Sequence, residues 1–268
     1  MLAAERRDYL LAQLSTEGKV VAKDVAHALG LSDDTVRRDL RDLAAAGLCQ
    51  RVYGGALPVS PAVADYPTRV GVEQESKQRV AARAVALIPP LGTVILDGGT
   101  TTQAVVRALP TDFRCTVITH SPTIAVALLD HPHVEVFMLG GRLFKHSVVA
   151  SGAAAVESTL GISADLFLVG VTGIHPEEGL TTGDADEAAM KRALAARAAE
   201  TYVLGSVEKI GTASRYRVLP LGDVAGIVTD APSTHPTLEQ LRRQGVAILD
   251  ASLPVPASPP PAPPGGSR

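Results

Sequence analysis

Cysteine and long apolar runs are both scarce in this 268-residue sequence. The two cysteines, Cys49 and Cys115, lie far apart and lack the spacing of metal ligands, which excludes a disulfide framework and a zinc site and indicates a reducing compartment. No run of about eighteen apolar residues occurs, and the first residues, MLAAERRDYLL, carry charges where a secretion signal needs an apolar centre. We therefore expect a cytoplasmic protein that contacts no membrane and uses no metal or cofactor.

An excess of positive charge is missing as well. The formal net charge is -3, which excludes a globally basic nucleic-acid binder but leaves local basic patches open. What is present is the composition of a soluble globular protein, with 46% hydrophobic and 20% charged residues. The length favours two domains over one, and no internal repeat is evident.

Composition divides the chain into four parts. Residues 1–57 have a helical pattern and end in RVYGGALPV. Residues 58–72 carry prolines that neither a helix nor a central strand tolerates comfortably, which indicates a linker. In residues 73–250, short apolar runs such as TVILDGG and VEVFMLGG alternate with alanine-rich helical stretches, as is typical of an α/β fold with a mostly parallel sheet covered on both faces. Residues 251–268 hold too much proline and glycine to pack, and predict a disordered tail.

The segment LSDDTVRRDLRDLAAAGL, residues 31–48, predicts a helix with two adjacent arginines on its surface. Val36, Leu40 and Leu43 recur at three- and four-residue intervals, which places one apolar stripe against a core. Arg37 and Arg38 lie off that stripe. Three acids at i,i+4 spacing could neutralise them, and they are Asp33, Asp34 and Asp42. Because residues 1–57 hold eight basic and eight acidic side chains, the arginines taken alone fit surface charge better than DNA contacts.

The residues on either side of this helix change that balance. Upstream, VVAKDVAHALGLS predicts a short helix and a glycine-bearing turn, so that residues of about 20–39 form a helix-turn-helix, which places its second helix in the major groove. Downstream, LCQRVYGGALPV alternates like a two-stranded ribbon around Gly54 and Gly55, and Arg51 lies where it could reach a phosphate. Helix, turn, helix and ribbon together predict a DNA-binding domain.

The stretch SDDTVRRDLRDLAAAGLCQRVYGGA resembles the signature of the DeoR family of bacterial transcription regulators. In that family a winged helix-turn-helix carries a Ser-x-x-Thr-[Ile/Val]-Arg-Arg-Asp-Leu recognition helix and an Arg-Val-His-Gly-Gly-Ala wing. Here a tyrosine replaces the wing histidine, which could alter its DNA contact. With the resemblance and the ribbon taken together, the candidate DNA-binding residues are Ser32, Thr35, Arg37, Arg38, Arg51 and Tyr53.

A glycine- and threonine-rich loop opens the second domain. VILDGGTTTQAVVRAL predicts a strand, this loop and a helix that begins near Thr101. Free backbone N–H groups, a positive helix end and hydroxyl donors can cradle a phosphate, and the residues that supply them are Gly98, Gly99, Thr100, Thr101 and Thr102. A plain tight turn is about as common an explanation, but the position at the carboxyl end of a strand in an α/β sheet favours a ligand site. Asp97 would repel a phosphate, so we place it against sugar hydroxyls or as an orienter of the loop.

Other strand ends carry polar groups that could complete this site. The candidate contacts there are Thr119, Ser121, Gly141, Arg142, Lys191 and Lys209, of which the last two and Arg142 are the available cations. Two of the cations have structural alternatives. Glu187 and Lys191 are a well-spaced helix pair, and Arg142 could simply lie on the surface.

The order of these motifs again resembles the DeoR family. Its sensor domain carries LDAGTTT, TNS, LGG, GI...GLTT.D..EA..K and a final DxSK, and is similar in fold to ribose-5-phosphate isomerase. The resemblance implies that a phosphorylated sugar is the effector. The chain departs at the last motif, where Ser206 replaces the aspartate and Glu208 the serine, while Lys209 matches.

A sugar-phosphate isomerase fused to a DNA-binding module is the alternative. Such an enzyme needs a carboxylate base, and the related isomerases carry an Asp-Gly-Ala-Asp stretch where this chain has GVTGI. His120 could substitute, but one loop histidine is more often a hydrogen-bonding group. We therefore predict a non-enzymatic repressor of sugar metabolism genes that binds a double-stranded DNA operator and a phosphorylated sugar effector. Because one winged module makes few contacts, we expect a homo-oligomer, either a dimer or a tetramer.

Overall fold

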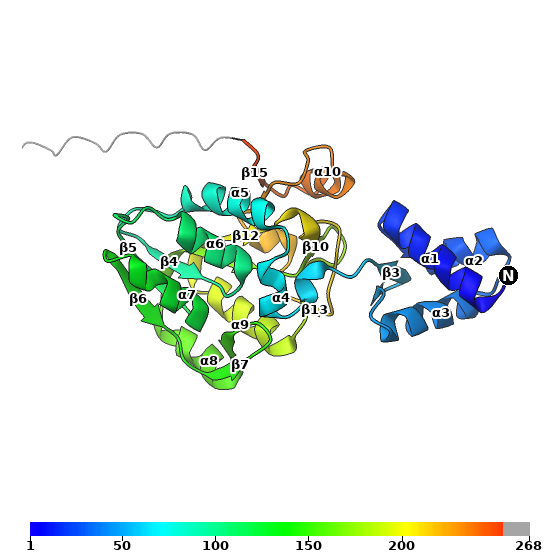
Figure 1. Ribbon diagram of the computed structural model, residues 1–268, viewed down its shortest axis with the longest axis horizontal. Coiled ribbons are helices and arrows are strands. Elements are labelled where there is room, and N and C mark those ends of the chain that lie inside the picture. The colour runs from blue at the N-terminus through cyan, green and yellow to red at the C-terminus, as the bar shows by residue number, and fades with distance from the viewer. Residues whose placement is uncertain (254–268) are drawn as a thin grey trace, which may run out of the picture.

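The computed structural model describes residues 1–253, so most of the predicted disordered tail, 251–268, lies outside the described residues. A small amino-terminal body is followed by a connecting segment and a larger α/β body (Figure 1). None of the helices in residues 1–253 has the length and apolar character that a membrane crossing needs.

The amino-terminal body packs three helices against three short strands. Its elements are α1 (Ala3–Glu17), β1 (Val20–Val21), α2 (Ala22–Leu29), α3 (Asp33–Ala45), β2 (Gln50–Val52) and β3 (Gly55–Leu57). The strands form an antiparallel sheet in the order β1-β3-β2. Leu10 of α1, Val25 of α2 and Leu40 of α3 meet in a core that is separate from the cores of the larger body.

Helix α3 follows the pattern predicted from the sequence. Val36, Leu40 and Leu43 are buried, which confirms the apolar stripe. Ser32 is the N-cap residue, and its Oγ accepts a hydrogen bond from the backbone N–H of Thr35 at 3.2 Å. Such a cap satisfies one of the N–H groups that the first turn leaves without a helical partner.

The connecting segment is more ordered than its prolines suggested. It contains the 3-10 helix η1 (Pro61–Val63) and the short helix α4 (Tyr66–Val70). Pro61 and Pro67 stand in the first positions of these helices, where a missing N–H removes no hydrogen bond. Helices therefore accommodate these prolines, contrary to the expectation that they would not tolerate them comfortably, while the linker role of residues 58–72 stays a prediction.

Seven parallel strands form the central sheet, in the order β15-β14-β12-β9-β4-β5-β6. Their bounds are β4 (Thr93–Leu96), β5 (Cys115–Thr119), β6 (Val134–Met138), β9 (Ala164–Gly170), β12 (Ala198–Leu204), β14 (Gly226–Thr229) and β15 (Ile248–Asp250). Every neighbouring pair in this order is parallel, which confirms the predicted α/β fold.

Helices cover both faces of this sheet. One core cluster joins it to α5 (Gln74–Val85), α6 (Thr100–Ala108) and α7 (Pro122–Ala127). The other joins it to α8 (Ala153–Ser158), α9 (Ala185–Ala195) and α10 (Pro236–Arg243). Along β4, Val94 and Leu96 belong to the first cluster and Ile95 to the second, as alternation along a strand requires. The 3-10 helices of this body are η2 (Leu128–Asp130), η3 (Thr159–Gly161), η4 (Val207–Lys209) and η5 (Leu221–Asp223).

Two small antiparallel sheets extend this body. One contains β10 (Gly173–His175), β11 (Gly179–Thr182) and β13 (Tyr216–Arg217), and the other contains β7 (Arg142–Phe144) and β8 (Val149–Ser151). The first follows directly after β9 and the second after β6, so both extend from the carboxyl ends of central strands. They form part of the surroundings of the glycine-rich loop.

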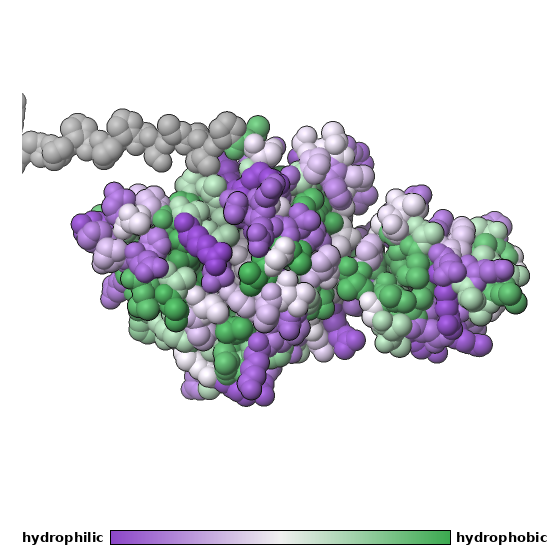
Figure 2. Space-filling view, in the orientation of Figure 1, coloured by the Kyte–Doolittle hydropathy of each residue, from purple (hydrophilic) through white to green (hydrophobic). Residues whose placement is uncertain are grey.

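Strand β6 is an open edge of the central sheet and exposes apolar side chains. Exposed apolar residues on β6 and the neighbouring α7 and η2 include Val126, Leu129, Phe137 and Met138. Figure 2 shows this apolar surface over β6 and α7. Soluble monomers seldom leave such a strand edge uncovered.

Candidate functional site

The predicted DNA-binding residues lie on the surface of the amino-terminal body. Arg37 and Arg38 are exposed on α3, and Thr35 lies one turn before Arg38 on the same side of the helix. In the ribbon, Arg51 of β2 is exposed, and Tyr53 is fully exposed in the turn between β2 and β3. The structure thus leaves the recognition helix and the ribbon accessible to a large partner.

Only one of the three predicted ion pairs along α3 forms. Arg37 pairs with Asp33 at 3.1 Å, with both side chains close to half exposed. Arg38 has no acidic partner within 4.0 Å in the part of the chain that the structure describes. Asp42, which could have paired with it, instead accepts a hydrogen bond from Arg7 of α1 at 2.7 Å. Arg38 is therefore available to an external anion.

A buried ion pair fixes the other side of α3. Asp39 is only 3% exposed and accepts hydrogen bonds from Nε and Nη2 of Arg6 in a two-pronged contact. Together with Arg7 and Asp42, this contact joins α3 to α1. Such planar double contacts fix orientation as well as distance.

The second candidate site is a pocket beyond the carboxyl ends of β4, β9 and β12. Its glycine-rich loop connects β4 to α6. Gly99 precedes α6 with φ 125°, and no side chain caps the helix. The first-turn N–H groups of Thr100, Thr101 and Thr102 therefore have no partner within the helix, and the helix dipole favours an anion beside them. All three threonines line the pocket.

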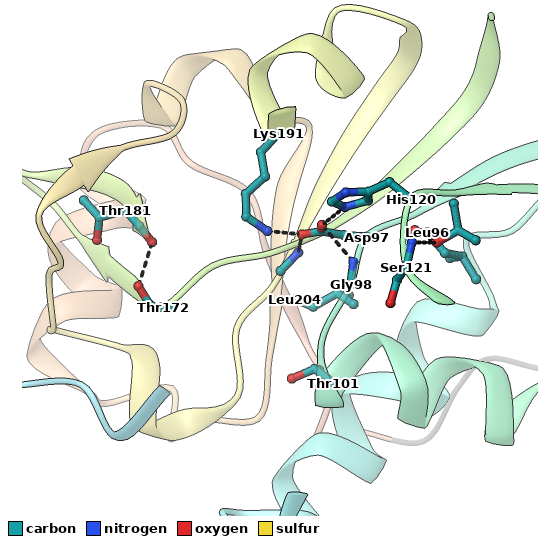
Figure 3. A network of polar contacts seen from close by, with 12 residues as sticks. Leu96, Asp97, Gly98, Thr101, His120, Ser121, Thr172, Thr181, Lys191 and Leu204 are labelled. Carbon is teal, nitrogen blue, oxygen red and sulfur yellow. Dashed lines mark hydrogen bonds and ion pairs between the residues drawn. The ribbon is translucent and has the colours of Figure 1, made fainter. Parts of the chain in front are cut away.

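Asp97, directly before this loop, is fully buried and accepts four hydrogen bonds. The backbone N–H groups of Gly98 and Gly170 each donate at 2.8 Å. Lys191 donates to the second carboxylate oxygen, and Nε2 of His120 lies 2.9 Å from the first. Figure 3 shows Lys191 and His120 converging on Asp97. Of the two roles expected for Asp97, this geometry is that of an orienter of the loop.

The charges around Asp97 determine its ionisation. Burial by itself raises the pKa of Asp97, but Lys191 and the hydrogen bond from His120 outweigh it and hold the pKa well below the ordinary value of 3.8. Lys191 therefore pairs with Asp97 and not with Glu187, the partner considered from helical spacing. Lys191 still lines the pocket.

Lys209 supplies a second buried ammonium group. Its Nζ donates to Oγ1 of Thr101 and to the carbonyl oxygen of Leu204, both at 3.1 Å. Because an ammonium group has three N–H donors, one remains for a ligand. Burial lowers the pKa of Lys209 to about 8, although the carboxylate of Glu208 acts in the opposite direction.

Besides the buried Asp97, four of the predicted contacts do not line this pocket. Thr119 is buried and its Oγ1 donates to the carbonyl oxygen of Leu96 at 2.7 Å. The hydroxyl of Ser121 lies 3.2 Å from the carbonyl oxygen of Val148 and 3.0 Å from Oγ1 of Thr123.

The other two lie on the β7 side. A Cβ at Gly141 would approach that of Ala155 to 2.7 Å, so this glycine allows close packing. Arg142 is exposed and pairs with Asp186 at 3.2 Å, which bears out the surface alternative. A position at the end of a strand was therefore not sufficient to predict which residues line the pocket.

The pocket also contains residues that the sequence analysis did not assign to it. Arg69 of α4 and Lys77 of α5 line it, as do the carboxylates Glu187 and Glu208. A signal for α4 was present: Asp65 is its N-cap, accepting from the N–H of Thr68 at 3.1 Å, and a proline follows in the first turn. The interpretation of residues 58–72 as a linker did not take this helix-start signal into account.

Models of one protein family match both the amino-terminal body and the larger α/β body. A family model of the DeoR-like helix-turn-helix domain matches residues 6–62, and one of the DeoR C terminal sensor domain matches residues 72–231. The HTH-type transcriptional regulator GlpR of Haloferax volcanii is 32% identical over 260 residues, which span 93% of this chain and 98% of the relative. The HTH-type transcriptional repressor GlcR of Bacillus subtilis is 31% identical over 251 residues, 93% of this chain and 96% of the relative.

A more distant relative and one solved structure complete the comparison. The glycerol-3-phosphate regulon repressor of Escherichia coli K12 is 26% identical over 233 residues, 87% of this chain and 92% of that protein. Ribose 5-phosphate isomerase A of Methanocaldococcus jannaschii matches with a TM-score of 0.36 and 15% identity, over 49% of this chain and 52% of that one.

Proposed function

We propose, from the premise that this chain belongs to the DeoR family of transcription regulators, that it is a repressor of carbohydrate genes whose affinity for its operator is changed by a phosphorylated sugar. The family membership makes it a DNA-binding regulator and not an enzyme. Several relatives are named repressors, and one of them is named for glycerol 3-phosphate, a phosphate ester.

One observation supports a phosphorylated effector: the glycine-rich loop at the start of α6 and the side chain of Lys209 line the same pocket. The uncapped start of α6 faces the same space as Lys209, whose third N–H donor is unused by the protein contacts described. A phosphate monoester has the oxygens and the charge that both groups can bind. We assign the phosphate subsite to Gly98, Gly99, Thr100, Thr101, Thr102 and Lys209, with Lys191 oriented by Asp97 beside it.

For operator binding we assign Ser32, Thr35, Arg37, Arg38, Arg51 and Tyr53. Arg38 and Arg51 are the strongest candidates for a DNA contact, since both are exposed and neither has an ion-pair partner among residues 1–253. The corresponding division of the chain is a DNA-binding domain, 1–57, a connecting segment, 58–72, and a sensor domain, 73–250.

We further propose that the chain acts as a homo-oligomer, since two recognition helices are needed to read symmetric half-sites. The occupant of the open β6 edge would be a second copy. Phe137 and Met138 are half exposed on that edge, and a strand edge can pair with its own symmetry mate through backbone hydrogen bonds. Light scattering of the purified protein tests this, and a Phe137→Lys variant should shift the assembly toward monomer.

Isomerase activity is not favoured at the strand end where the related isomerases carry their carboxylates; Glu187 and Glu208 line the pocket elsewhere, so turnover is the deciding measurement. The segment after β9, Val171 and Thr172, carries no carboxylate, and the Asp97 carboxylate already accepts four hydrogen bonds. With its pKa well below 3.8, Asp97 is a poor proton acceptor. Any sugar phosphate that binds should be recovered unchanged.

A two-stage experiment tests the proposed function. A thermal-shift screen of sugar phosphates, with the matching unphosphorylated sugars as controls, identifies the ligand. Operator duplexes selected from a random pool then report DNA affinity with and without it. We expect stabilisation by a phosphorylated sugar alone and a change in operator affinity of about tenfold or more. Equal stabilisation by the unphosphorylated sugar would contradict a phosphate subsite.

A further inference from the structure

The segment that connects the DNA-binding domain to the sensor domain forms one side of the effector pocket. Ala62 of η1 is buried and lines the pocket, and Arg69 of α4 lines it as well. A Cβ built on Gly99 would lie 3.8 Å from Nη1 of Arg69. The guanidinium group therefore lies beside the start of α6, on the loop that we assign to the phosphate.

The guanidinium group of Arg69 is incompletely satisfied by the protein. Its Nε and Nη2 atoms are buried and have no hydrogen-bond partner within residues 1–253. Burial lowers the pKa of Arg69, while the carboxylates of Glu187 and Asp97 raise it. No carboxylate of the described chain forms a salt bridge with it. Because buried donors without partners are costly, these two atoms of the partly buried Arg69 favour binding of an anion beside them.

Contacts on both sides of Arg69 hold this segment on the sensor domain. Nζ of Lys77 donates to the carbonyl oxygen of Arg69 at 2.7 Å and to that of Val72. Tyr66, at the start of α4, donates its hydroxyl to Oε1 of Gln103 in α6 at 2.6 Å. The backbone N–H of Tyr66 donates to the carbonyl oxygen of His146 at 2.8 Å. A group that binds the guanidinium therefore acts on a segment already anchored to α5 and α6.

We propose that Arg69 binds the phosphate of the effector, so that the segment leading to the DNA-binding domain is itself part of the ligand site. The planar guanidinium can donate two parallel hydrogen bonds to two phosphate oxygens, whereas the ammonium groups of Lys191 and Lys209 act as point charges without that fixed geometry. Phosphate bound between Arg69 and the start of α6 joins the connecting segment to the sheet. The occupied and empty pockets then differ in the segment that carries the DNA-binding domain, which is the differential contact that allosteric coupling requires.

This inference rests on the proposed function, and inorganic phosphate is the probe that tests it. Binding is measured by titration calorimetry on the full chain at constant ionic strength, with chloride as the matched salt. Arg69→Met should weaken phosphate binding by about 10- to 100-fold, since a charge-assisted contact is lost. Arg69→Lys keeps the positive charge but loses the planar guanidinium, so its phosphate affinity should lie between those of wild type and Arg69→Met. Arg114→Met, an exposed arginine before the amino end of β5, is the matched control and should bind as wild type does.

A second measurement follows the segment itself. Phosphate should slow amide hydrogen exchange of residues 60–72 in wild type and in Arg114→Met, and leave it unchanged in Arg69→Met. Equal phosphate affinity in wild type and in both Arg69 variants would overturn the role of Arg69 while leaving the phosphate site intact. Absence of phosphate binding by wild type would overturn both. Should Arg69→Met not fold, the Arg69→Lys titration decides, because lysine retains the stem and the charge of the side chain.

Discussion

The two bodies of this regulator use charged side chains in opposite settings. On α3, Arg37 is 44% exposed and pairs with Asp33 on its own helix, and Arg38 is exposed without an ion-pair partner in the described chain. In the sensor pocket, Asp97 is 0% and Lys191 5% exposed, and each has its partner on a distant segment. A charge in water costs little to keep, whereas a buried charge is stable only while its partners remain.

This difference separates binding from stability. Loss of an exposed arginine should affect the DNA complex alone, because solvent screens its local ion pairs. Loss of a buried pocket charge should affect folding and ligand response together, because its charged or polar partners then stay buried without a compensating contact. Five predictions test whether the separation holds, from the largest expected effect to the smallest.

Asp97→Ala should have the largest effect. It leaves the ammonium of Lys191 and the ring of His120 without their carboxylate, which should lower the free energy of unfolding of the sensor domain by about 3 to 5 kcal/mol. Chemical denaturation followed by circular dichroism measures this. Asp34→Asn, an exposed control on α3, should change the value by less than about 0.5 kcal/mol. A loss below about 1 kcal/mol at Asp97 would break the comparison.

The pH dependence of stability should follow from the same carboxyl group. The folded pKa of Asp97 lies below the unfolded value of 3.8, so the folded protein keeps the charge at pH values where the unfolded chain takes up a proton. The stabilisation is therefore present above about pH 4 and is lost as the pH falls below it. Acid denaturation of wild type and Asp97→Asn should converge at low pH.

Arg38→Ala should weaken operator binding by about 1 to 3 kcal/mol and leave the unfolding transition unchanged. Arg37→Ala should have a smaller effect, because Asp33 already neutralises part of that charge. Fluorescence anisotropy with the selected operator measures both. If Arg38→Ala binds the operator as wild type does, the arginines of α3 are surface charge and the contrast between the two bodies loses its functional meaning.

Phosphate affinity should fall as the pH rises. The ammonium of Lys209, with its pKa lowered to about 8, loses its proton as the pH passes that value, whereas a phosphate monoester is already fully ionised above about pH 7. Between pH 7 and 9.5 we expect a loss of about tenfold in affinity for the effector. Lys209→Met should bind more weakly at pH 7 and show a flat profile. An equally steep profile in this variant would assign the titration to another group.

The smallest effect is expected at the wing. Tyr53 is fully exposed, so Tyr53→Ala should leave stability unchanged and weaken operator binding by about 0.5 to 1 kcal/mol through one lost hydrogen bond. Tyr53→His restores the wing residue of the family pattern and should alter the preference among operators more than the affinity. A repeat of the duplex selection with this variant reads out that preference.

Local sequence pattern predicted what depends on local geometry. The stripe of Val36, Leu40 and Leu43 and the position of the loop after β4 follow from periodicities of a helix and a strand, and both are present in the structure. The parallel order of the sheet follows from alternation of short apolar runs with helices.

Contacts between distant segments could not be predicted in this way. Helical spacing suggested that Lys191 would pair with Glu187, but the tertiary fold brings Asp97 to its ammonium. Helical spacing likewise suggested an ion pair between Arg38 and Asp42, but Asp42 pairs instead with Arg7 of α1. Arg69 was hidden for a related reason, since its site is created only when α4 packs beside the loop at Gly99.

The contact between Arg6 and Asp39 has a consequence for the thermodynamics of DNA recognition. It orients α3 from its buried side before any DNA is present, so the helix undergoes no folding step on binding. The conformational entropy of that helix is lost during synthesis and folding, not at the operator. The heat-capacity change of complex formation should then be small and reflect interface burial alone, without the large negative value of a coupled folding transition.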